Sequence, residues 1–492
     1  MRLLRLHTLG MLLMALIVLP AVTSCYDYGQ EENLPEVPPA PATPKYINVT
    51  VSVSASENAF TRAPKGGEYG DKTEEGNDRE NEVKNVTLIF YEDDDNNIGI
   101  NTVSDQVKVK YVKRCLMRRI AGDDLPSDYE HTHKTGESAT AQGQEVLYTT
   151  GNQRLDDSAL ELEKPYKLLV LANSYVEVNV GEKIKDVRDK VTNTVYTGSG
   201  VGEDATDFVM SSEADATVTL SNPTPEVTSS QISLVYYFPC IHIERLAARI
   251  DFDTTGGTYD QDLGGYKYTI TGGDIFVLTS VTPFNLYAEN EYLFKRVQNN
   301  WTDATTTTTY LGDETVDNNN VANNYVVDPK TSLKNNSNTF YYFSSIASDF
   351  GSNIYTHSMA TSQTSPVIVC YAKENTLMPE SQLKKYATGI AFTGEYYPSG
   401  IGGSHVTRTY YHYIRHQGEQ NDSYEAKLWD ELDKAGTGAN QPDVSAADVP
   451  MNIGIVRNNI YRISLKSEGE GTLKVVVKET KWRHVDNPTI YI

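Results

Sequence analysis

The sequence predicts a mainly β fold, built as two β-sandwich domains with one or two short helices. Short apolar runs bounded by polar loops, such as Val86–Tyr91 and Tyr166–Asn173, have the length of central strands in a sandwich. The segment Lys45–Ala55 alternates apolar and polar residues, which predicts a half-buried strand. Helical spacing is confined to Glu182–Val191 and Tyr424–Ala435, so helices contribute little to the predicted fold.

Length and composition favour a globular chain with more than one domain. The chain has 492 residues, of which 39% are apolar and 10% aromatic, and this is enough to build a sizeable core. A stretch rich in Pro, Thr and Ser, Asn222–Ser230, precedes a new series of strands that begins at Ile232. We therefore place the domain boundary near residue 235.

The N-terminus has the features of a bacterial lipoprotein signal. Residues 4–21 form an apolar run behind Arg2 and Arg5, and the run is followed by Val22-Thr23-Ser24-Cys25. Small residues before a cysteine are typical of a signal whose cysteine is acylated and becomes the new N-terminus. No other apolar run approaches the ~20 residues of a membrane-spanning helix. We expect a protein that is anchored by acyl chains or released, and that does not span the membrane.

Charge and cysteine content exclude several classes of partner and site. The formal charge of −23 argues against nucleic acid and against an anionic membrane surface as partners. Besides Cys25, the chain contains Cys115, Cys240 and Cys370, whose spacing matches no metal site. We expect three small buried apolar side chains, and the sequence leaves open whether two of them form a disulfide.

The strand at Lys45–Ala55 precedes an accessible arginine. Its alternation places Ile47, Val49, Val51 and Val53 together on one side. The stretch that follows, Asn58–Gly67, is rich in turn-forming residues and offers Arg62 to a trypsin-like protease.

Two blocks in the second half of the chain complete a recognisable pattern. One reads Arg245-Leu246-Ala247-Ala248-Arg249-Ile250, and the other reads Val456-Arg457-Asn458-Asn459-Ile460-Tyr461 and lies downstream of a Tyr- and His-rich strand at Thr409–His416. Together with the order of lipidation cysteine, strand and arginine, these blocks resemble the Bacteroidales fimbrillins, the subunits of type V pili. The resemblance looks closest to the minor-fimbrium shaft type.

We interpret the residues of these two blocks as structural. Isoleucines such as Ile455 and Ile460 supply core side chains, and Arg457-Asn458-Asn459 interrupts them with polar groups suited to a turn, bulge or cap. Direct ligand binding by Arg457 and the asparagines is the alternative. The motif residues with this structural interpretation are Arg245, Ala248, Arg249, Val456, Arg457, Asn458, Asn459 and Tyr461.

The resemblance implies a transthyretin-like, Greek-key fold and a route of assembly. The lipoprotein precursor reaches the outer membrane, an arginine-specific protease cleaves between Arg62 and Ala63, and the first strand leaves. The vacated groove then accepts a C-terminal strand from the next subunit. The implied regions are a signal peptide at 1–24, a propeptide at 25–62, sandwich domains at 63–235 and 236–471, and a donor-strand region at 472–492.

The C-terminus offers a candidate donor strand. Leu473, Val475 and Val477 can line one face, and Ile490 and Ile492 continue the alternation after a proline. The alternative is that residues 472–492 form an ordinary hairpin that closes the second domain.

Catalytic and metal-binding patterns are weak. His131-Thr132-His133 lacks a third ligand at a recognisable spacing. The acidic run Glu92–Asn97 has Ile98 where a calcium loop needs glycine and Ser104 where it needs glutamate, so we predict a hairpin turn. His412 and His416 have no serine or cysteine elbow beside them. We predict no enzyme, no metal and no cofactor.

The sequence therefore predicts a fimbrial shaft subunit, made as an outer-membrane lipoprotein precursor and assembled into a surface fimbrium for adhesion. The expected partners are other copies of the chain, accessory fimbrial subunits, an arginine-specific protease, the outer membrane before processing, and host or bacterial surface ligands. One alternative is a monomeric surface lipoprotein that binds glycans or proteins. Others are a basal anchor subunit, which would keep the Cys25 lipid and the first strand, and a tip subunit, which would need the groove but no donor strand.

Overall fold

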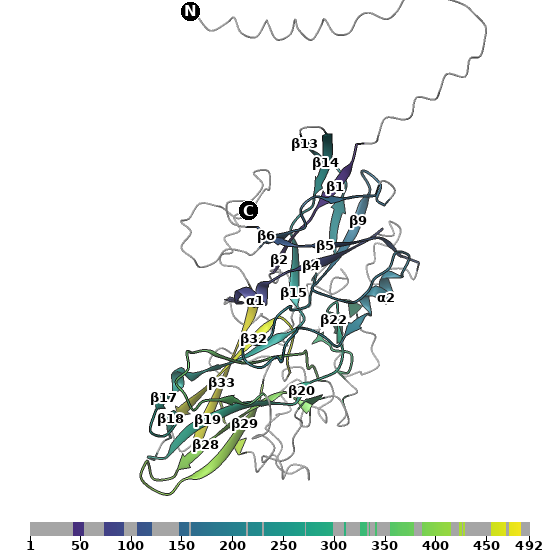
Figure 1. Cartoon of the computed structure of the whole chain (residues 1–492). Coiled ribbons are helices and arrows are strands. Elements are labelled where there is room, and N and C mark those ends of the chain that lie inside the picture. Colours follow the sequence, from purple (N-terminus) through teal and green to yellow (C-terminus); the bar gives the residue numbers. More distant parts are fainter. Residues whose placement is uncertain are drawn as a thin grey trace, which may run out of the picture. The chain divides into compact units, whose positions relative to one another are not determined.

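Strands form almost all of the regular structure, as Figure 1 shows for this computed structural model. The predicted mainly β fold is confirmed, and the described residues contain two short α-helices, α1 (Asp78–Asn81) and α2 (Ile184–Arg188), with one 3-10 turn, η1 (Thr254–Gly256). The structure describes residues 43–53, 73–92, 106–120, 147–156, 159–212, 215–228, 231–270, 272–298, 309–310, 325–331, 334, 340–341, 355–377, 386–414, 423–425, 427–428, 454–468 and 472–483.

The first two sheets are built mostly from strands of the N-terminal half of the chain. One sheet has the order β13 (Thr224–Thr228), β14 (Gln231–Tyr237), β1 (Lys45–Asn48) and β8 (Gln153–Arg154). The other has the order β5 (Val109–Leu116), β4 (Asn85–Tyr91), β9 (Pro165–Ala172), β11 (Met210–Ser212), β15 (Ile241–Arg245), β2 (Thr50–Val53), β7 (Leu147–Thr149) and β6 (Arg118–Arg119), with β12 (Ala216–Thr219) also paired to β9.

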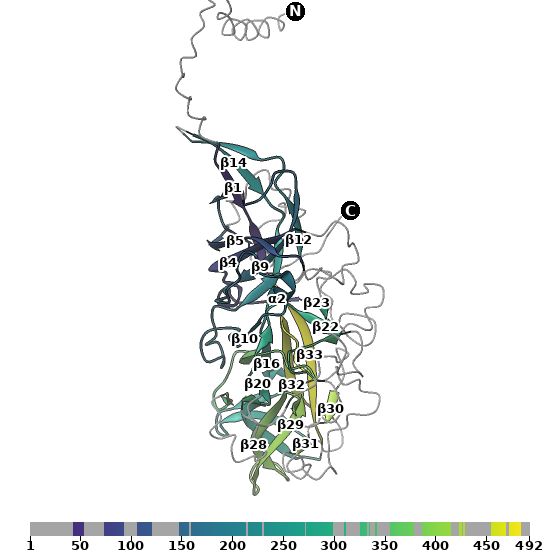
Figure 2. The same ribbon diagram turned by 90° about the vertical axis from the view of Figure 1, so that its right-hand side faces the viewer.

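The next two sheets are built from the second half of the chain and β3. One has the order β27 (Val367–Ala372), β16 (Ala248–Asp253), β32 (Asn459–Glu468), β33 (Thr472–Arg483) and β3 (Thr73–Glu75), with β30 (Ser423–Glu425) paired to β33. The other has the order β17 (Thr258–Asp260), β18 (Gly265–Thr269), β19 (Ile275–Phe284), β28 (Gly389–Tyr397), β29 (Val406–Tyr413) and β31 (Lys427–Leu428), with β26 (His357–Ser358) paired to β19. Figure 2 shows β16, β32 and β33 side by side.

Short strands complete the structure. They are β10 (Val191–Thr192) with β21 (Glu291–Tyr292), β20 (Leu286–Tyr287) with β25 (Phe340–Tyr341), and β22 (Arg296–Gln298) between β23 (Thr309–Tyr310) and β24 (Tyr325–Val326).

The two longest predicted strands form where their apolar runs lie. β4 and β9 pair antiparallel, and β4 also pairs with β5. Residues Val86–Tyr91 are buried on both faces, as are residues Leu168–Ala172 of β9. A continuous apolar run is therefore required here, because a strand inside a covered sheet has no solvent-facing side. The turn predicted at Glu92–Asn97 lies, apart from Glu92, outside the described residues.

Two hydrophobic cores hold the sheets together. Buried residues up to Ala247 pack in the first core, and those of β16 and the strands paired with it pack in the second. The second core lies between two sheets, because it joins Ile250, Ile463 and Val475 of one sheet to Phe276 and Phe392 of the other. The predicted boundary near residue 235 stays a prediction.

The two cores are not independent of each other. Four buried residues from the second half, Leu293, Phe294, Tyr371 and Ile460, pack in the first core. Strands β10 and β21 also pair residues from the two halves, with Val191 opposite Tyr292. The second half therefore supports the strands that surround the first strand.

One predicted helix is wrong where the structure describes it. Within Tyr424–Ala435, Tyr424 and Glu425 lie in β30 and Lys427–Leu428 form β31. These strands pair with β33 and β29, so backbone pairing outweighs the local helical preference. The rest of that segment lies outside the described residues. The helix predicted within Glu182–Val191 is confirmed as α2.

Cys115 and Cys370, two of the described cysteines, are free thiols. Cys115 and Cys370 are buried, as predicted, whereas Cys240 is only half-buried. Burial raises the pKa of Cys115 to about 11 and that of Cys370 still further above its ordinary value. Neither of these two thiols is therefore activated at neutral pH. Within the ranges that the structure describes, no helix is long and apolar enough to cross a membrane.

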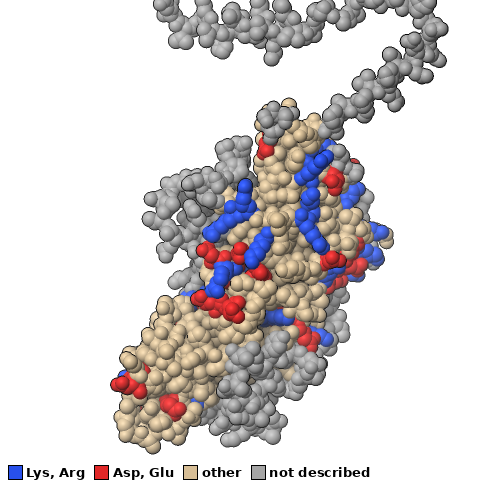
Figure 3. Space-filling model, in the orientation of Figure 1, with Lys and Arg blue, Asp and Glu red and all other residues tan. Residues whose placement is uncertain are grey.

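Charged side chains are unevenly distributed over the surface. The face in Figure 3 carries several Lys and Arg side chains over the first pair of sheets and few charges over the second pair. Lys110, Arg114, Arg118 and Arg119 are exposed on β5 and β6, the outer strands of their sheet. Charged side chains on outer strands disfavour pairing with another chain, so these edges are protected against strand addition.

Candidate functional site: the groove of the first strand

The first strand, Lys45–Val53, passes from one sheet of the first core to the other. β1 pairs in parallel with β14 and antiparallel with β8, whereas β2 pairs in parallel with β15 and antiparallel with β7. Between them, the N–H of Val49 donates to Thr150 Oγ1 at 3.1 Å, and the carbonyl of Val49 accepts from the N–H of Thr150 at 3.0 Å. The single strand expected at Lys45–Ala55 is therefore two short strands that meet at Val49.

The side chains predicted to face the core do so. Ile47, Val49, Val51 and Val53 are 0% exposed. At about 1.5–3 kcal/mol for each buried aliphatic side chain, the four together contribute about 6–12 kcal/mol.

The expected half-buried character is wrong beyond Asn48. Thr50 and Ser52, on the opposite side of the strand, are only 5% and 0% exposed. The reason is that β2 lies between β15 and β7 in a sheet whose two faces are both covered there. β2 is thus enclosed on both sides and on both faces, whereas β1 is half-buried at Lys45, Tyr46 and Asn48.

Removal of the first strand would leave a groove with two walls. β15 would lose the partner of Ile241–Ile243, and β7 would lose the partner of Leu147–Thr149. The backbone groups of both walls would then face the gap, and unpaired edges of this kind accept another strand. The replaceable role of Ile47, Val49, Val51 and Val53 stays a prediction.

A buried arginine fixes the end of the β15 wall. Arg245 Nε donates to the carbonyl of Glu80 at 2.9 Å, Nη1 donates to Asn458 Oδ1 at 3.2 Å, and Nη2 donates to Asn81 Oδ1. Burial lowers the pKa of Arg245 to about 10, so the side chain remains charged at neutral pH. β15 is thereby joined to α1 and to the turn before β32.

Glu80 of α1 is the centre of this buried cluster. Its Oε2 lies 3.0 Å from Arg249 Nη1, and its Oε1 accepts from the Tyr371 hydroxyl. Arg249 also pairs with Asp251, with Nη2 and Oδ2 2.9 Å apart. Burial lowers the pKa of Arg249, but Asp251 and Glu80 outweigh it and raise that pKa above its ordinary value. Glu80 also forms the capping box of α1 with Asn77, which explains a helix of only four residues.

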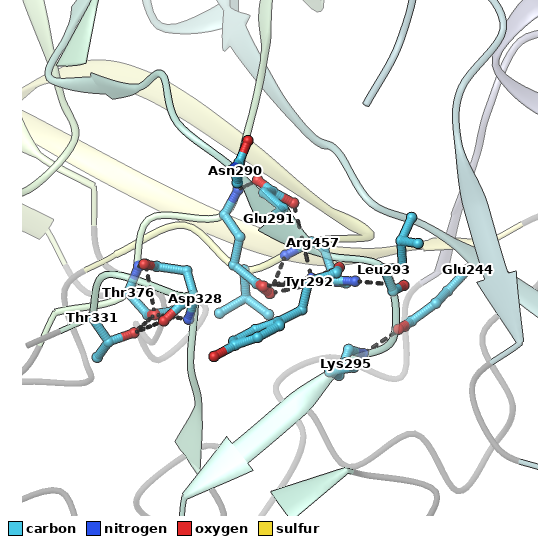
Figure 4. Close-up of polar contacts among 12 residues, drawn as sticks. Glu244, Asn290, Glu291, Tyr292, Leu293, Lys295, Asp328, Thr331, Thr376 and Arg457 are labelled. Atoms are coloured by element: carbon cyan, nitrogen blue, oxygen red, sulfur yellow. Dashed lines mark hydrogen bonds and ion pairs between the residues drawn. The ribbon is translucent and has the colours of Figure 1, made fainter. Parts of the chain in front are cut away.

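A second buried cluster surrounds Arg457 (Figure 4). Its Nη2 lies 2.9 Å from Glu374 Oε2 and donates to the carbonyl of Tyr292 at 2.8 Å. The N–H of Glu374 donates to Glu291, which is also fully buried. Burial opposes the charge of Arg457, but the carboxylate of Glu374 outweighs it and raises the pKa of the guanidinium. Burial raises the pKa of Glu291 to about 8, so this carboxyl is mostly protonated at neutral pH.

Two buried lysines complete the polar interior. Lys295 donates to Glu244 (Figure 4). Glu244 follows Ile243 in β15, and Ile243 pairs with Val53 of the first strand. Lys334 pairs with Asp328, and Asp328 Oδ2 also accepts from the N–H of Thr376 at 2.8 Å. Because Glu244 and Arg245 are adjacent, the Glu244–Lys295 ion pair and the hydrogen bonds of the Arg245 side chain hold the same end of β15. The wall of the groove is therefore anchored independently of β2.

The two sequence blocks that carry the family resemblance meet in space. The N–H of Asn458 donates to the carbonyl of Ala247 at 2.9 Å, and β16 pairs in parallel with β32, with Arg249 opposite Ile460. Asn458 has a φ of 56°, a left-handed conformation that asparagine tolerates. The residues between Val456 and Asn459 form a turn, and the side chain of Asn459 donates to the carbonyl of Val456 at 3.3 Å.

All the motif residues are buried. They are Arg245, Ala248, Arg249, Val456, Arg457, Asn458, Asn459 and Tyr461. Their side chains contact other parts of this chain, and these contacts favour the structural interpretation over direct ligand binding.

The processing residues lie outside the described part of the chain. These are Cys25, Arg62 and Ala63, and the same holds for Ile490 and Ile492 of the predicted donor. Leu473 and Val475 lie in β33 and pack in the second core, while Val477 is paired with Ile463. β33 pairs with β32 from Thr472 to Lys481. The alternative of a closing hairpin over residues 472–492 is not tested, because residues 484–492 lie outside the described residues. The donor role of residues 472–492 stays a prediction.

The sequence alone did not reveal the acidic partners of the motif arginines. Glu80, Glu374 and Glu291 lie in short elements or loops whose local sequence is ordinary for exposed residues. Only Asn77 and Glu80 carry a signal, because their spacing is that of a capping box.

The weak metal and catalytic candidates receive no support where they are described. His412 is buried in β29, whereas His131, His133 and His416 fall outside the described residues. Of the acidic run, only Glu92 is described, and it pairs with Lys110 and Lys164. Over the described ranges, no group of three or more His, Cys, Asp or Glu side chains could hold a metal ion.

Comparison with known proteins gives similarities of fold at low sequence identity. No family model and no curated protein matches the sequence. A candidate cell adhesion protein of Parabacteroides distasonis is 13% identical over 90% of this chain and 98% of its own, with a TM-score of 0.40. A fimbrilin (fimA) of Porphyromonas gingivalis W83 is 12% identical over 90% and 99%, with a TM-score of 0.38. The tip fimbrial protein Mfa3 of Porphyromonas gingivalis, truncated at its C-terminus, is 10% identical over 89% and 100%, with a TM-score of 0.35. At TM-scores below 0.5, the role of this chain has to be argued from its own geometry.

Proposed function

We propose that this chain is a fimbrial shaft subunit that assembles by strand exchange. In this proposal it is exported as a lipoprotein through Cys25 and cleaved between Arg62 and Ala63. The observation that carries the proposal is the place of the first strand, which lies inside two sheets and is fully buried along its apolar side. Loss of an enclosed strand leaves a vacancy that only another strand can fill without leaving backbone groups unpaired.

Three outer strands of the first two sheets support the same role. β5 and β6, at the ends of the nine-stranded sheet, carry exposed Lys and Arg, and the outer strand β13 contains Pro225, which has no N–H to donate. Strand addition at these edges is disfavoured. The groove between β15 and β7 is therefore the favoured place for a strand from another copy.

Because β15 is anchored by contacts outside the first strand, we expect the groove to keep its shape after the first strand has left. The pairs Arg245–Asn81 and Glu244–Lys295 fix the end of β15 without any contribution from β2. A preorganised groove loses less conformational entropy when a strand enters it.

The structure also narrows the proposed donor. Leu473 and Val475 are core residues of the second sandwich, and removing each from its site would cost about 2–5 kcal/mol. We therefore assign the inserted residues to the end of the chain, with Ile490 and Ile492, and leave β33 in place as the base from which the donor extends.

Proteolysis of the purified precursor tests the proposal. Treatment with a trypsin-like protease should produce a ladder of stable oligomers on gels. Arg62→Gln, which removes the cleavage site, should abolish the ladder, and so should deletion of residues 484–492. Leu473→Ala should destabilise the subunit but leave the ladder in place.

The outcome separates the alternatives. A trimmed monomer after complete cleavage at Arg62 would contradict strand exchange and favour the monomeric binding protein. A ladder formed by the protein that lacks residues 484–492 would contradict the donor assignment alone. Two results together would indicate the basal anchor. The precursor would resist cleavage at Arg62, and the protein recovered from intact cells would be acylated at Cys25.

A further inference from the structure

The hairpin formed by β13 and β14 exposes apolar side chains that the first core does not cover. Val227 is 76% exposed and Ile232 is 55% exposed, and the two lie directly opposite each other in the pairing of the hairpin. Figures 1 and 2 show β14 beside β1, at the place where the chain enters the first sheet. Because the two side chains are contiguous, they form a small apolar patch, and exposed apolar patches rimmed by polar residues mark candidate interaction sites.

One face of the hairpin carries a continuous row of apolar side chains. Val227 and Ile232 share a face with Leu234 and Tyr236, because residues two apart on a strand point the same way. Tyr236 belongs to the first core and Leu234 packs against it. Val227 and Ile232 therefore continue the core-facing side of the hairpin past the last residues that the first core covers.

Apart from the buried Val235, the opposite face of the hairpin is mostly polar and is already occupied. The Tyr237 hydroxyl donates to Glu226 Oε1 at 2.9 Å, and Asn152 Nδ2 donates to Glu226 Oε2 at 2.7 Å. The outer edge of β13 contains Pro225 and cannot extend the sheet regularly. A partner is therefore expected on the apolar face of the hairpin.

The place of the hairpin beside the first strand determines which partner it meets. Leu234–Tyr237 of β14 pair in parallel with Lys45–Asn48 of β1, and Ile241–Ile243 of β15 pair in parallel with Val51–Val53 of β2. A replacement strand that runs in the direction of the first strand would pass β14 before it reaches β15. The residues that precede that strand, and the subunit to which they belong, would then lie next to the hairpin.

We infer that Val227 and Ile232 form a docking surface for a second copy of this chain, the copy that supplies the strand. This inference rests on the proposed strand exchange and extends it to a contact outside the groove. The hairpin face adds an apolar contact between the folded bodies of successive subunits. Because Val227 and Ile232 are uncharged, we expect this contact to be insensitive to salt.

A pair of double variants tests the inference on the full-length precursor. V227S/I232S removes the exposed pair. L116S/V180S is the matched control, because Leu116 and Val180 are also exposed and Leu116 lies on β5, which four other strands separate from β2 in its sheet. After cleavage at Arg62, the concentration of subunit left unassembled at equilibrium is measured for each protein. We expect V227S/I232S to raise that concentration at least tenfold, which corresponds to about 1.4 kcal/mol, and the control to match the wild type.

A labelling experiment supplies a second readout that does not depend on the yield of polymer. Val227→Cys should react with a maleimide at least tenfold more slowly in the polymer than in the precursor, whereas Leu116→Cys should react equally in both. Equal assembly of V227S/I232S and the wild type, or equal labelling of position 227 in both states, would overturn the inference. Failure of the wild-type protein to assemble would instead contradict the proposed function.

Discussion

Weakening the first strand should destabilise the precursor and speed release of the cleaved strand. The variant is V49A/V51A, which shortens two neighbouring core-facing side chains of the strand. Both are 0% exposed, so each substitution removes two buried methyl groups and leaves a small cavity. Both residues lie in the segment that is cleaved off and lost in the proposed assembly. They should therefore contribute to the stability of the precursor and not to the stability of the assembled subunit.

The expected magnitude follows from the burial of these side chains. Each Val→Ala substitution in such a site should cost about 2 kcal/mol, from lost burial and from the cavity. The pair should cost about 4 kcal/mol, with a coupling term because the two positions are close. At about 1.4 kcal/mol per factor of ten, the cleaved strand should be held about a thousandfold more weakly.

Three measurements detect the effect. Urea unfolding of the uncleaved precursor gives the change in the free energy of unfolding. After cleavage at Arg62, gel filtration followed by mass spectrometry gives the rate at which the N-terminal peptide leaves the subunit, and gels give the rate of oligomer formation. Both rates should rise in V49A/V51A.

A control in the same core separates the strand from its surroundings. V86A/V170A shortens two equally buried valines in β4 and β9, which the proposal keeps in the assembled subunit. It should destabilise the precursor to a similar degree and should also destabilise the polymer, whereas V49A/V51A should leave the polymer unchanged. If V49A/V51A lowered the stability of the polymer as much as V86A/V170A does, residues 45–53 would have to be present in it, and the reasoning would be refuted.

Two further predictions concern the buried charges. The free energy of unfolding should fall as pH rises from about 4.5 to about 8, because the folded state keeps a proton on Glu291 up to a pKa of about 8 while the unfolded chain releases it near 4.5. Glu291→Gln should flatten this slope in urea unfolding across that pH range, and an unchanged slope would contradict the assignment. Glu80→Gln should cost about 3–5 kcal/mol, since it breaks a buried pair, whereas Glu203→Gln, at an exposed pair with Arg79, should cost at most about 1 kcal/mol. Equal losses for the two variants would show that the Glu80 cluster does not anchor α1.

The strands that could be predicted are those whose signal is local. Val86–Tyr91 and Tyr166–Asn173 are continuous apolar runs, and they form β4 and β9 because a strand covered on both faces needs such a run. The first strand was found from its alternation, but the break at Val49 and the burial of Ser52 depend on the neighbouring strands. Local periodicity cannot reveal which other strands enclose a segment.

The failures have the same origin. Leu428 and Tyr424 have helical spacing, yet both lie in strands because β29 and β33 offer them backbone partners. Helix α1 was missed because four residues are too few to show a period, although Asn77 and Glu80 have the spacing of a capping box. Tertiary pairing decides short segments of this kind.

The buried charges of the site were the least predictable feature. The sequence blocks around Arg245 and Arg457 were recognised as structural, but their partners are far away along the chain. Glu80 lies 169 residues before Arg249, and Asn458 lies 213 residues after Arg245. Nothing in the local sequence distinguishes Glu80 or Glu374 from an exposed acidic residue, so only the fold reveals that they hold β15 and the turn before β32 in place.

The N-terminal residue of the protein taken from the cell surface tests the central claim most directly. Sequencing of assembled material should begin at Ala63, and mass spectrometry should find no peptide from residues 45–53. Assembled protein that still carries these residues, or that begins at an acylated Cys25, would contradict assembly by exchange of the first strand.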